Sequence, residues 1–133
     1  MTDSLSRFQP HVLGALRIMT GLLFLAHGLQ KMFSFPAPFP YPLSPLLTVA
    51  GVLEIVGGVL IVLGLLTRPT AFVLSGFAAA AYFLGHATQG FWPVLNGGDA
   101  AILYCFVFLY LVVAGPGAWS LDGVRGGREA RAA

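Results

Sequence analysis

Four long apolar runs constrain this chain more than any other feature of its sequence. They occupy residues 12–33, 46–66, 70–91 and 97–118. A helix rises about 1.5 Å per residue, so the first three runs are roughly 31–33 Å long, enough to cross a hydrocarbon core of about 30 Å. The uninterrupted part of the fourth, residues 100–114, is only roughly 22 Å long and crosses only if its flanks also enter the membrane. The runs predict one all-α domain over residues 1–133, a polytopic membrane protein built as a four-transmembrane-helix bundle.

Composition excludes several classes of protein. Of the 133 residues, 57% are hydrophobic and 9% are charged, whereas a soluble domain carries about 25% charged residues. A soluble domain of about 150 residues buries only roughly 70% of its unfolded surface, too little to hide so much apolar area. A net charge of +2 without a basic stripe argues against nucleic-acid binding. The single cysteine, Cys105, excludes an internal disulfide, so a redox role needs a bound cofactor or a partner subunit.

Positive charge predicts the direction of the helices, because cytoplasmic loops carry an excess of Lys and Arg. The basic residues assigned to one side are Arg7, Arg17, Arg68, Arg125, Arg128 and Arg131. The opposite side, with a proline-rich outer loop at residues 34–45, has only Lys31. Both termini, including a basic tail at residues 122–133, are therefore predicted to be cytoplasmic. The length of the first run and the Arg17 inside it favour a retained helix over a cleaved signal peptide.

Residues between the runs carry helix-end signals. Ser44-Pro45 is typical of an N-cap followed by proline in the first turn, so it predicts the start of the second helix. Residues 67–69 are expected to close the second helix and open the third. Residues 96–99, Asn-Gly-Gly-Asp, predict a cap with an acid in the first turn of the fourth helix. Residues 115–117, Gly-Pro-Gly, predict its end.

Ionisable residues within the runs are predicted to converge near the outer surface. His27, Glu54 and His86 each lie roughly 8–12 Å from the outer end of their helix, and Asp99 opens the fourth helix on the same side. Ionisable side chains in a membrane usually face the bundle interior and mark functional sites. We therefore expect a proton relay formed by His27, Glu54, His86 and Asp99. Further candidate ligand-binding residues are Lys31, Arg17, Tyr82 and Asn96.

Each of these residues also has a purely structural interpretation. Lys31 and Arg17 are long enough to extend to the headgroups on their respective sides. Asp99 is placed to complement the N-terminus of the fourth helix, and the histidines are alternatively neutral packing residues. Glu54 lies in mid-helix, where it cannot cap, so it must be protonated or paired. Lys31 and His27 are both candidate partners for Glu54.

The proline-rich outer loop, residues 34–45, alternates prolines with aromatic residues. Alternate prolines remove backbone donors and favour an extended backbone. Such a segment is interpreted as an interfacial connector, with a lid over the polar cluster as the alternative.

A short internal similarity suggests a two-plus-two repeat. Residues 25–30, Leu-Ala-His-Gly-Leu-Gln, are similar to residues 84–89, Leu-Gly-His-Ala-Thr-Gln. The helix that follows each motif carries an acid near its start, Glu54 or Asp99. Parallel repeats of this kind are known in membrane transporters. Six positions are few, so chance similarity stays an open alternative.

Motifs along the whole chain resemble the DoxX family of small bacterial membrane proteins. In chain order they are Arg17-Ile18 with Gly21, Phe24 to Gly28 and Lys31; Glu54 to Gly58 and Leu63 to Arg68; Asn96 to Asp99; and Gly115 to Asp122. Asp99 is a conservative departure, because the family usually has Glu there. The motifs cover residues 13–123 in the family's order and spacing, so the resemblance is specific.

The resemblance implies a multi-pass protein of the bacterial inner (plasma) membrane. Some members of the family are subunits of a thiosulfate:quinone oxidoreductase. The resemblance therefore implies a quinone-linked redox subunit, with a quinone as its cofactor and a separate redox subunit as its partner. Such a chain is not a complete enzyme alone.

Three alternatives remain at this point. One is a non-enzymatic anchor or scaffold that holds a soluble redox or stress-response partner at the lipid bilayer. A second is a metal site made by His27, Glu54, His86 and Asp99, but the paired Glu-x-x-His pattern of di-iron bundles is absent, so no metal is expected. A third is a small-solute transporter, which with four short helices would need to form a homo-oligomer.

Overall fold

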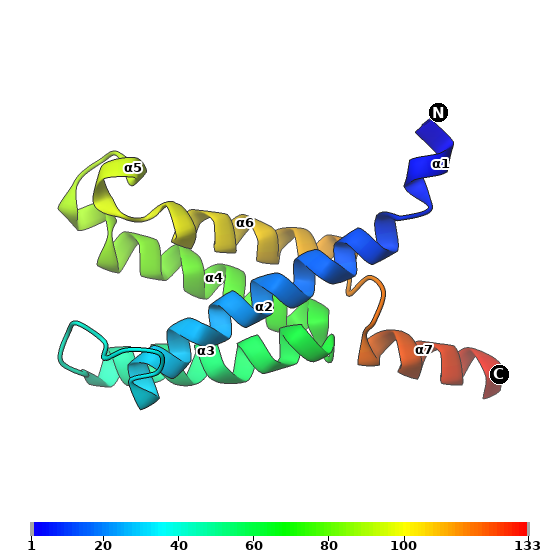
Figure 1. Cartoon of the computed structure of the whole chain (residues 1–133), viewed down its shortest axis with the longest axis horizontal. Coiled ribbons are helices and arrows are strands. Elements are labelled where there is room, and N and C mark those ends of the chain that lie inside the picture. The colour runs from blue at the N-terminus through cyan, green and yellow to red at the C-terminus, as the bar shows by residue number, and fades with distance from the viewer. Residues whose placement is uncertain (1, 133) are drawn as a thin grey trace. The chain divides into compact units, whose positions relative to one another are not determined.

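The computed structural model describes residues 2–132, and these form helices joined by short connections without any strand (Figure 1). The prediction of an all-α protein is confirmed. Among the described residues, three segments are long and apolar enough to cross a membrane: Gln9–Phe33, Pro45–Leu63 and Thr67–Gln89. Asp99–Ala114 is a shorter apolar helix, as the length of the fourth run predicted. The contacts divide the chain into two units: one runs up to Thr67 and resumes at Pro116, and the other is Arg68–Gly115.

The described part of the first unit forms α1 (Thr2–Ser6), α2 (Gln9–Phe33), α3 (Pro45–Leu63) and α7 (Leu121–Ala132). The predicted start of α3 is confirmed, because the Ser44 side chain accepts a hydrogen bond of 3.2 Å from the backbone N–H of Leu47. Gly64 then ends α3 in the left-handed conformation with φ +63°, which costs glycine little. Residues 122–133 were predicted only as a basic tail, and most of that tail is the helix α7.

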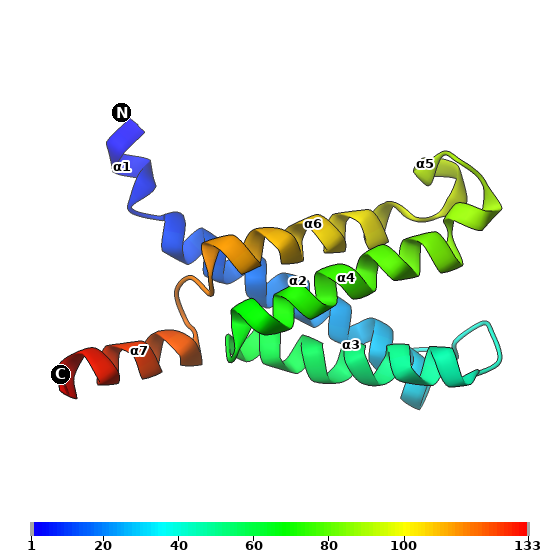
Figure 2. The same cartoon turned by 180° about the vertical axis from the view of Figure 1, so that it is seen from behind.

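Helices α2 and α3 lie side by side and touch through glycines (Figures 1 and 2). A Cβ added to Gly28 would lie 2.8 Å from the carbonyl oxygen of Gly51, and one added to Gly58 would lie 2.9 Å from the backbone nitrogen of Leu25. Small residues at such positions let the backbones of membrane helices approach closely. The α2–α3 packing therefore depends on the absence of side chains at these glycines.

We expect Gly28→Ala to lower the free energy of unfolding by about 1–3 kcal/mol, because the new methyl group must push the two helices apart. Gly76→Ala is the matched control, since a Cβ on Gly76 would meet nothing within 4 Å. Removing a mid-helix glycine there should be neutral or stabilising by up to about 1 kcal/mol. Thermal unfolding in detergent measures both changes. Equal effects of the two substitutions would contradict the glycine contact.

The second unit contains α4 (Thr67–Gly85), the 3-10 helix η1 (Ala87–Gln89), α5 (Pro93–Asn96) and α6 (Asp99–Ala114). Helices α4 and α6 run side by side in both views (Figures 1 and 2). The guanidinium of Arg68 donates to the carbonyl oxygens of Val112 and Val113, each at 2.7 Å. Further along, the Ser75 hydroxyl donates to the carbonyl oxygen of Cys105 at 2.8 Å. These bonds fix the register of the pair.

The helices of the second unit differ from the predicted spans in their ends. α4 starts at Thr67, three residues before the predicted run 70–91. Pro69 is tolerated there because it lies in the first turn, where backbone N–H groups have no helical partner. α6 is shorter than the predicted 97–118, because Gly97 and Gly115 have φ of +72° and +81°. Asn96 does not cap α6. Its side-chain oxygen instead accepts the N–H of Gly98 at 2.8 Å.

Candidate functional site

The centre of the first unit's candidate site is an ion pair between α2 and α3. The Lys31 Nζ lies 2.8 Å from both carboxylate oxygens of Glu54. The two side chains are only 11% and 7% exposed. Of the two partners considered for Glu54, the structure selects Lys31, and Lys31 is not extended to the headgroups. A nearly buried pair with a bidentate carboxylate keeps two charges inside an apolar helix pair.

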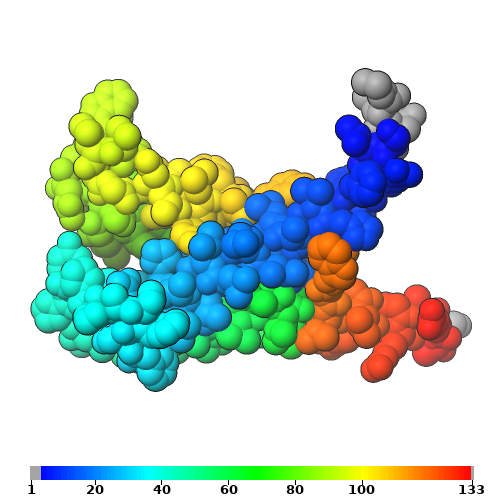
Figure 3. All heavy atoms as spheres, viewed as in Figure 1, coloured from blue at the N-terminus to red at the C-terminus, as the bar shows by residue number. Residues whose placement is uncertain are grey.

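The proline-rich outer loop contributes an aromatic ring to this ion pair. The Lys31 Nζ lies 5.3 Å from the ring centroid of Phe39, which is within cation–π distance. Phe39 packs edge-on against Tyr41, with ring centroids 5.7 Å apart. The loop forms a continuous mass of atoms, drawn in cyan, at one end of the first unit (Figure 3). Phe39 was not predicted as a site residue, because the sequence does not show where a loop folds.

His27 lies one turn before Lys31 on α2, but its side chain is exposed at the surface of the chain. A stripe of α2 next to His27 is buried. Its buried members include Arg17, Gly21, Phe24 and Gly28. His27 stands at the edge of this stripe and not within the buried pair.

Arg17 lies at the opposite end of the first unit from Lys31, fourteen residues or roughly 21 Å along α2. Its side chain is 0% exposed, so extension of Arg17 to the headgroups is wrong. The guanidinium donates five hydrogen bonds of 2.7–3.0 Å to backbone carbonyl oxygens. The acceptors are Ile61, Val62, Pro116, Ala118 and Trp119. Arg17 therefore ties the C-terminal end of α3 to the segment that follows α6, and it does not belong to the Lys31–Glu54 site.

Asp122 completes this end of the first unit. Its carboxylate accepts the backbone N–H groups of Leu66 and Thr67, each at 2.9 Å, and its own N–H donates to the carbonyl of Gly64 at 2.9 Å. Burial raises the pKa of Asp122, but the hydrogen bonds from Thr67 and Leu66 and the charge of Arg125 outweigh it and hold that pKa below its ordinary value. Asp122 therefore joins the start of α7 to the turn between α3 and α4 by hydrogen bonds.

The depressed pKa of Asp122 predicts a loss of stability in acid. A carboxylate with a lowered folded-state pKa stabilises the fold above its unfolded pKa of about 3.9 and loses that contribution as pH falls through the folded value. We expect Asp122→Asn to lower the melting temperature at neutral pH and to differ progressively less from the parent below about pH 4. Glu129→Gln, an exposed change on α7, is the control. A constant difference across this range would contradict the assignment.

The second unit brings together three predicted residues, Tyr82, His86 and Asn96. The His86 Nδ1 lies 3.1 Å from the carbonyl oxygen of Asn96, and since a carbonyl only accepts, this nitrogen carries the proton. The Asn96 side-chain nitrogen donates to the Tyr82 hydroxyl at 3.3 Å and to the carbonyl of Gly90 at 2.9 Å. The rings of Tyr82 and His86 are stacked with centroids 6.5 Å apart. Asp99 is exposed in the first turn of α6, where an acid complements the helix dipole.

Each unit therefore contains part of the predicted set. The first holds the Lys31–Glu54 pair with His27 one turn away, and the second holds the network around Asn96. Convergence of all four relay residues stays a prediction. Within each unit, the described residues form no group of three His, Cys, Asp or Glu side chains arranged to hold a metal ion.

Comparison with known proteins places the chain among small membrane proteins. The model of the DoxX family matches residues 12–87. An uncharacterized protein of Haemophilus influenzae is 44% identical over 127 residues, which cover 90% of this chain and 95% of the relative. An uncharacterized membrane protein of Mycobacterium tuberculosis is 32% identical over 132 residues, covering 80% of this chain and 77% of the relative. Inner membrane protein YphA of Escherichia coli is 32% identical over 131 residues, covering 86% and 90%. No solved structure matches the chain.

Proposed function

This chain belongs to the DoxX family of multi-pass inner-membrane proteins, and on that premise we propose that it is the membrane subunit of a quinone-linked redox complex. The observation that carries the proposal is the buried Lys31–Glu54 pair. The partner of this chain would be a separate redox subunit that supplies electrons, as in a thiosulfate:quinone oxidoreductase. The lipid bilayer would supply the quinone.

The pair supports this function because reduction of a quinone takes up protons as well as electrons. An ionisable pair that is 11% and 7% exposed is costly in a membrane, and such residues commonly serve proton pathways. Glu54 is able to hold or release a proton, and Lys31 controls it by direct contact at 2.8 Å. His27, exposed one turn away on α2, is a further proton carrier on the path to solvent.

The proposed orientation places this site near the outer surface, with both termini in the cytoplasm. It rests on the excess of arginine at the opposite ends of the helices. Phe39 and the proline-rich outer loop would then lie between the pair and the outer aqueous phase. This arrangement would slow the passage of water and ions without closing the site to protons.

The test compares two variants in the complex purified from native membranes. Glu54→Gln keeps the size of the side chain but cannot carry a proton. We expect it to lower quinone reduction by about 10²–10⁴-fold, the usual contribution of a general acid or base. Glu129→Gln, an exposed acid on α7, is the matched control and should leave the rate unchanged. Normal turnover by an abundant, folded Glu54→Gln protein would overturn the proposal.

A second function, a membrane anchor for a soluble partner, is favoured by the geometry of α7. This helix is exposed over residues 123–132. Its three arginines, Arg125, Arg128 and Arg131, recur every third residue and so share one face. Replacing all three with Gln should release a soluble partner with an acidic surface during purification. If the same variant still reduces quinone with its partner bound, the arginine face is not an anchor.

A further inference from the structure

Two arginines that bind helix ends differ in how many of their donors are used. In the first unit, Arg17 donates all five of its N–H groups to backbone carbonyl oxygens. In the second unit, the Arg68 Nη1 donates to the carbonyl oxygens of Val112 and Val113, each at 2.7 Å. The Nε and Nη2 of Arg68 have no acceptor in the described part of the chain. Arg68 therefore keeps three N–H donors for another partner.

The free donors of Arg68 form one edge of its guanidinium, and the fold leaves this edge open. Nε and Nη2 present parallel N–H groups, the arrangement that binds two oxygens of one phosphate or carboxylate. In Arg17 the same edge is filled, because carbonyl oxygens of residues 116–119 accept from its Nε and Nη2 at 2.7–3.0 Å. Beside Arg68 lies Gly115, where an added Cβ would be 3.0 Å from Nη2 and 3.6 Å from Nε. The lack of a side chain at Gly115 thus leaves room next to the free donors.

The charge of Arg68 is also without a counter-charge in the second unit. Residues 68–115 contain one acid, Asp99, and it lies at the start of α6, whereas Arg68 binds the carbonyls near its end. The sixteen residues of α6 separate the two by roughly 24 Å. An anionic partner is therefore favoured over a neutral one.

The position of Arg68 selects lipid as the source of the anion. Arg68 is the second residue of α4, at the start of the segment Thr67–Gln89 that can cross a membrane. It is exposed, and so are apolar side chains beside it: Phe72, one turn along α4, is 68% exposed, and Val113 is 74% exposed. Long basic side chains at the ends of membrane helices place their charge at the level of the headgroups. Arg68 thus joins an apolar surface for acyl chains to a cationic edge for a headgroup.

We propose that Arg68 binds the phosphate group of one anionic phospholipid, whose acyl chains lie along Phe72 and Val113. Two phosphate oxygens accept from Nε and Nη2, while Nη1 stays bonded to the end of α6. A protein carboxylate would have to be desolvated among exposed apolar side chains, whereas a lipid brings acyl chains that match them. In the proposed orientation this end of α4 faces the cytoplasmic leaflet, which carries anionic lipids.

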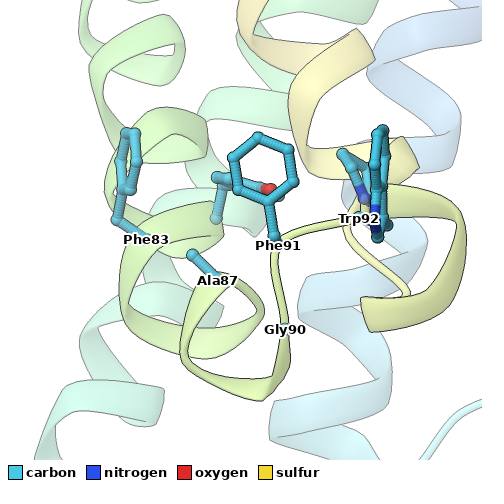
Figure 4. A pocket seen from close by; sticks show the side chains of 7 residues that line it. Phe83, Ala87, Gly90, Phe91 and Trp92 are labelled. Atoms are coloured by element: carbon cyan, nitrogen blue, oxygen red, sulfur yellow. The ribbon is translucent and has the colours of Figure 1, made fainter.

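The other end of α4 offers lipid no such selection. There the rings of Phe83, Phe91 and Trp92 surround an open apolar hollow (Figure 4). Its lining contains no charged side chain, so acyl chains can occupy it whatever headgroup they carry. In the second unit, preference for a headgroup therefore depends on Arg68.

The first experiment measures lipid binding to the full chain by native mass spectrometry. Dioleoyl phosphatidylglycerol is the probe, and dioleoyl phosphatidylcholine, which has the same chains and phosphate but no net charge, is the comparison. We expect one phosphatidylglycerol to bind at least about fivefold more tightly, the effect of pairing one basic residue with an anionic lipid. Millimolar inorganic phosphate should not displace it, because phosphate has no acyl chains. Displacement by phosphate, or equal binding of the two lipids, would overturn the proposal.

Substitutions of Arg68 separate its charge from its hydrogen-bonding edge. Arg68→Met should weaken phosphatidylglycerol binding about tenfold or more, because charge-assisted hydrogen bonds are lost. Arg68→Lys keeps the charge but lacks the parallel N–H groups, so it should weaken binding about three- to fivefold. Arg7→Met, which removes the same charge from another exposed position, is the matched control and should change binding less than about twofold. Equal weakening by Arg7→Met and Arg68→Met would show unspecific attraction and contradict a site at Arg68.

A chemical measurement locates the site in the unsubstituted protein. Phenylglyoxal modifies accessible guanidinium groups, and mass spectrometry of the peptides gives the rate at each arginine. Relative to Arg7 in the same sample, Arg68 should react at least about fivefold more slowly in phosphatidylglycerol nanodiscs than in phosphatidylcholine nanodiscs. If this ratio is the same in both lipids, Arg68 does not bind the anionic lipid. None of these measurements involves quinone, so the lipid site and the proposed redox function are tested separately.

Discussion

Replacing Arg17 with methionine is expected to lower the free energy of unfolding by at least about 3 kcal/mol, one of the two largest effects on stability expected for this chain. The side chain is 0% exposed and donates to five carbonyl oxygens. Methionine fills a similar volume but offers no donor, so buried acceptors lose their partners. Arg17→Lys should recover only part of the loss, because an ammonium group has three donors and lacks the planar fork of a guanidinium.

Two other arginines give a graded control for this prediction. Arg68 donates to two carbonyl oxygens from an exposed position, and Arg128 is exposed on α7. The melting temperature in detergent should therefore fall most for Arg17→Met, less for Arg68→Met and hardly at all for Arg128→Met. If Arg17→Met unfolds at the same temperature as Arg128→Met, the hydrogen bonds from Arg17 to α3 and to the segment after α6 are not what holds the first unit together.

The second large effect is expected at the ion pair. Removing one member of a nearly buried pair leaves an unpaired charge and costs about 3–5 kcal/mol, whereas replacing both members with apolar residues of similar size is often neutral or stabilising. Lys31→Met and Glu54→Leu should each destabilise the protein, and the double variant should recover most of the loss. The strong coupling follows from the 2.8 Å contacts and the 11% and 7% exposure of the side chains.

A double-mutant cycle measures this coupling as the deviation from additivity of the two unfolding free energies. Additive losses would show that Lys31 and Glu54 act separately and that the contact contributes little. The double apolar variant has a second use. If it is stable yet inactive in quinone reduction, charge at this position serves function and not folding.

The structure also gives a different form to the internal repeat suggested by the two histidine motifs. His27 is exposed, whereas His86 is half-buried and bonded to the backbone of Asn96, so the two are not equivalent. The closer likeness lies at the other end of each helix pair. Arg17 donates to the carbonyls of Ile61 and Val62, and Arg68 donates to those of Val112 and Val113, all at 2.7 Å.

Each unit thus uses an arginine on its first long helix to bind two consecutive carbonyls close to the C-terminal end of its second. A glycine follows each of these C-terminal ends, Gly64 after α3 and Gly115 after α6. The last carbonyls of a helix lack donors from a following helical turn, and a guanidinium supplies donors at these ends. Short sequence motifs missed this relation, because it joins residues more than forty positions apart.

The sequence by itself determined the class of the fold and the positions of its main elements. Apolar length sets which segments cross a bilayer, and Ser44-Pro45 sets the start of α3 through local bonds that any tertiary structure would keep. It also singled out Lys31 and Glu54, because charge is scarce in this chain. These properties depend on one residue and its near neighbours, so they can be read from the sequence alone.

Only the tertiary structure decided which polar groups meet. Arg17 was expected to reach the headgroups and is instead fully buried among carbonyl oxygens from α3 and from the segment after α6. Phe39 above Lys31, and Asp122 on the turn between α3 and α4, likewise depend on contacts between distant segments. A guanidinium or a ring finds its partner only when the backbone has folded, because nearly every residue carries the same backbone carbonyl and N–H, and the sequence does not show which of them will be the partner.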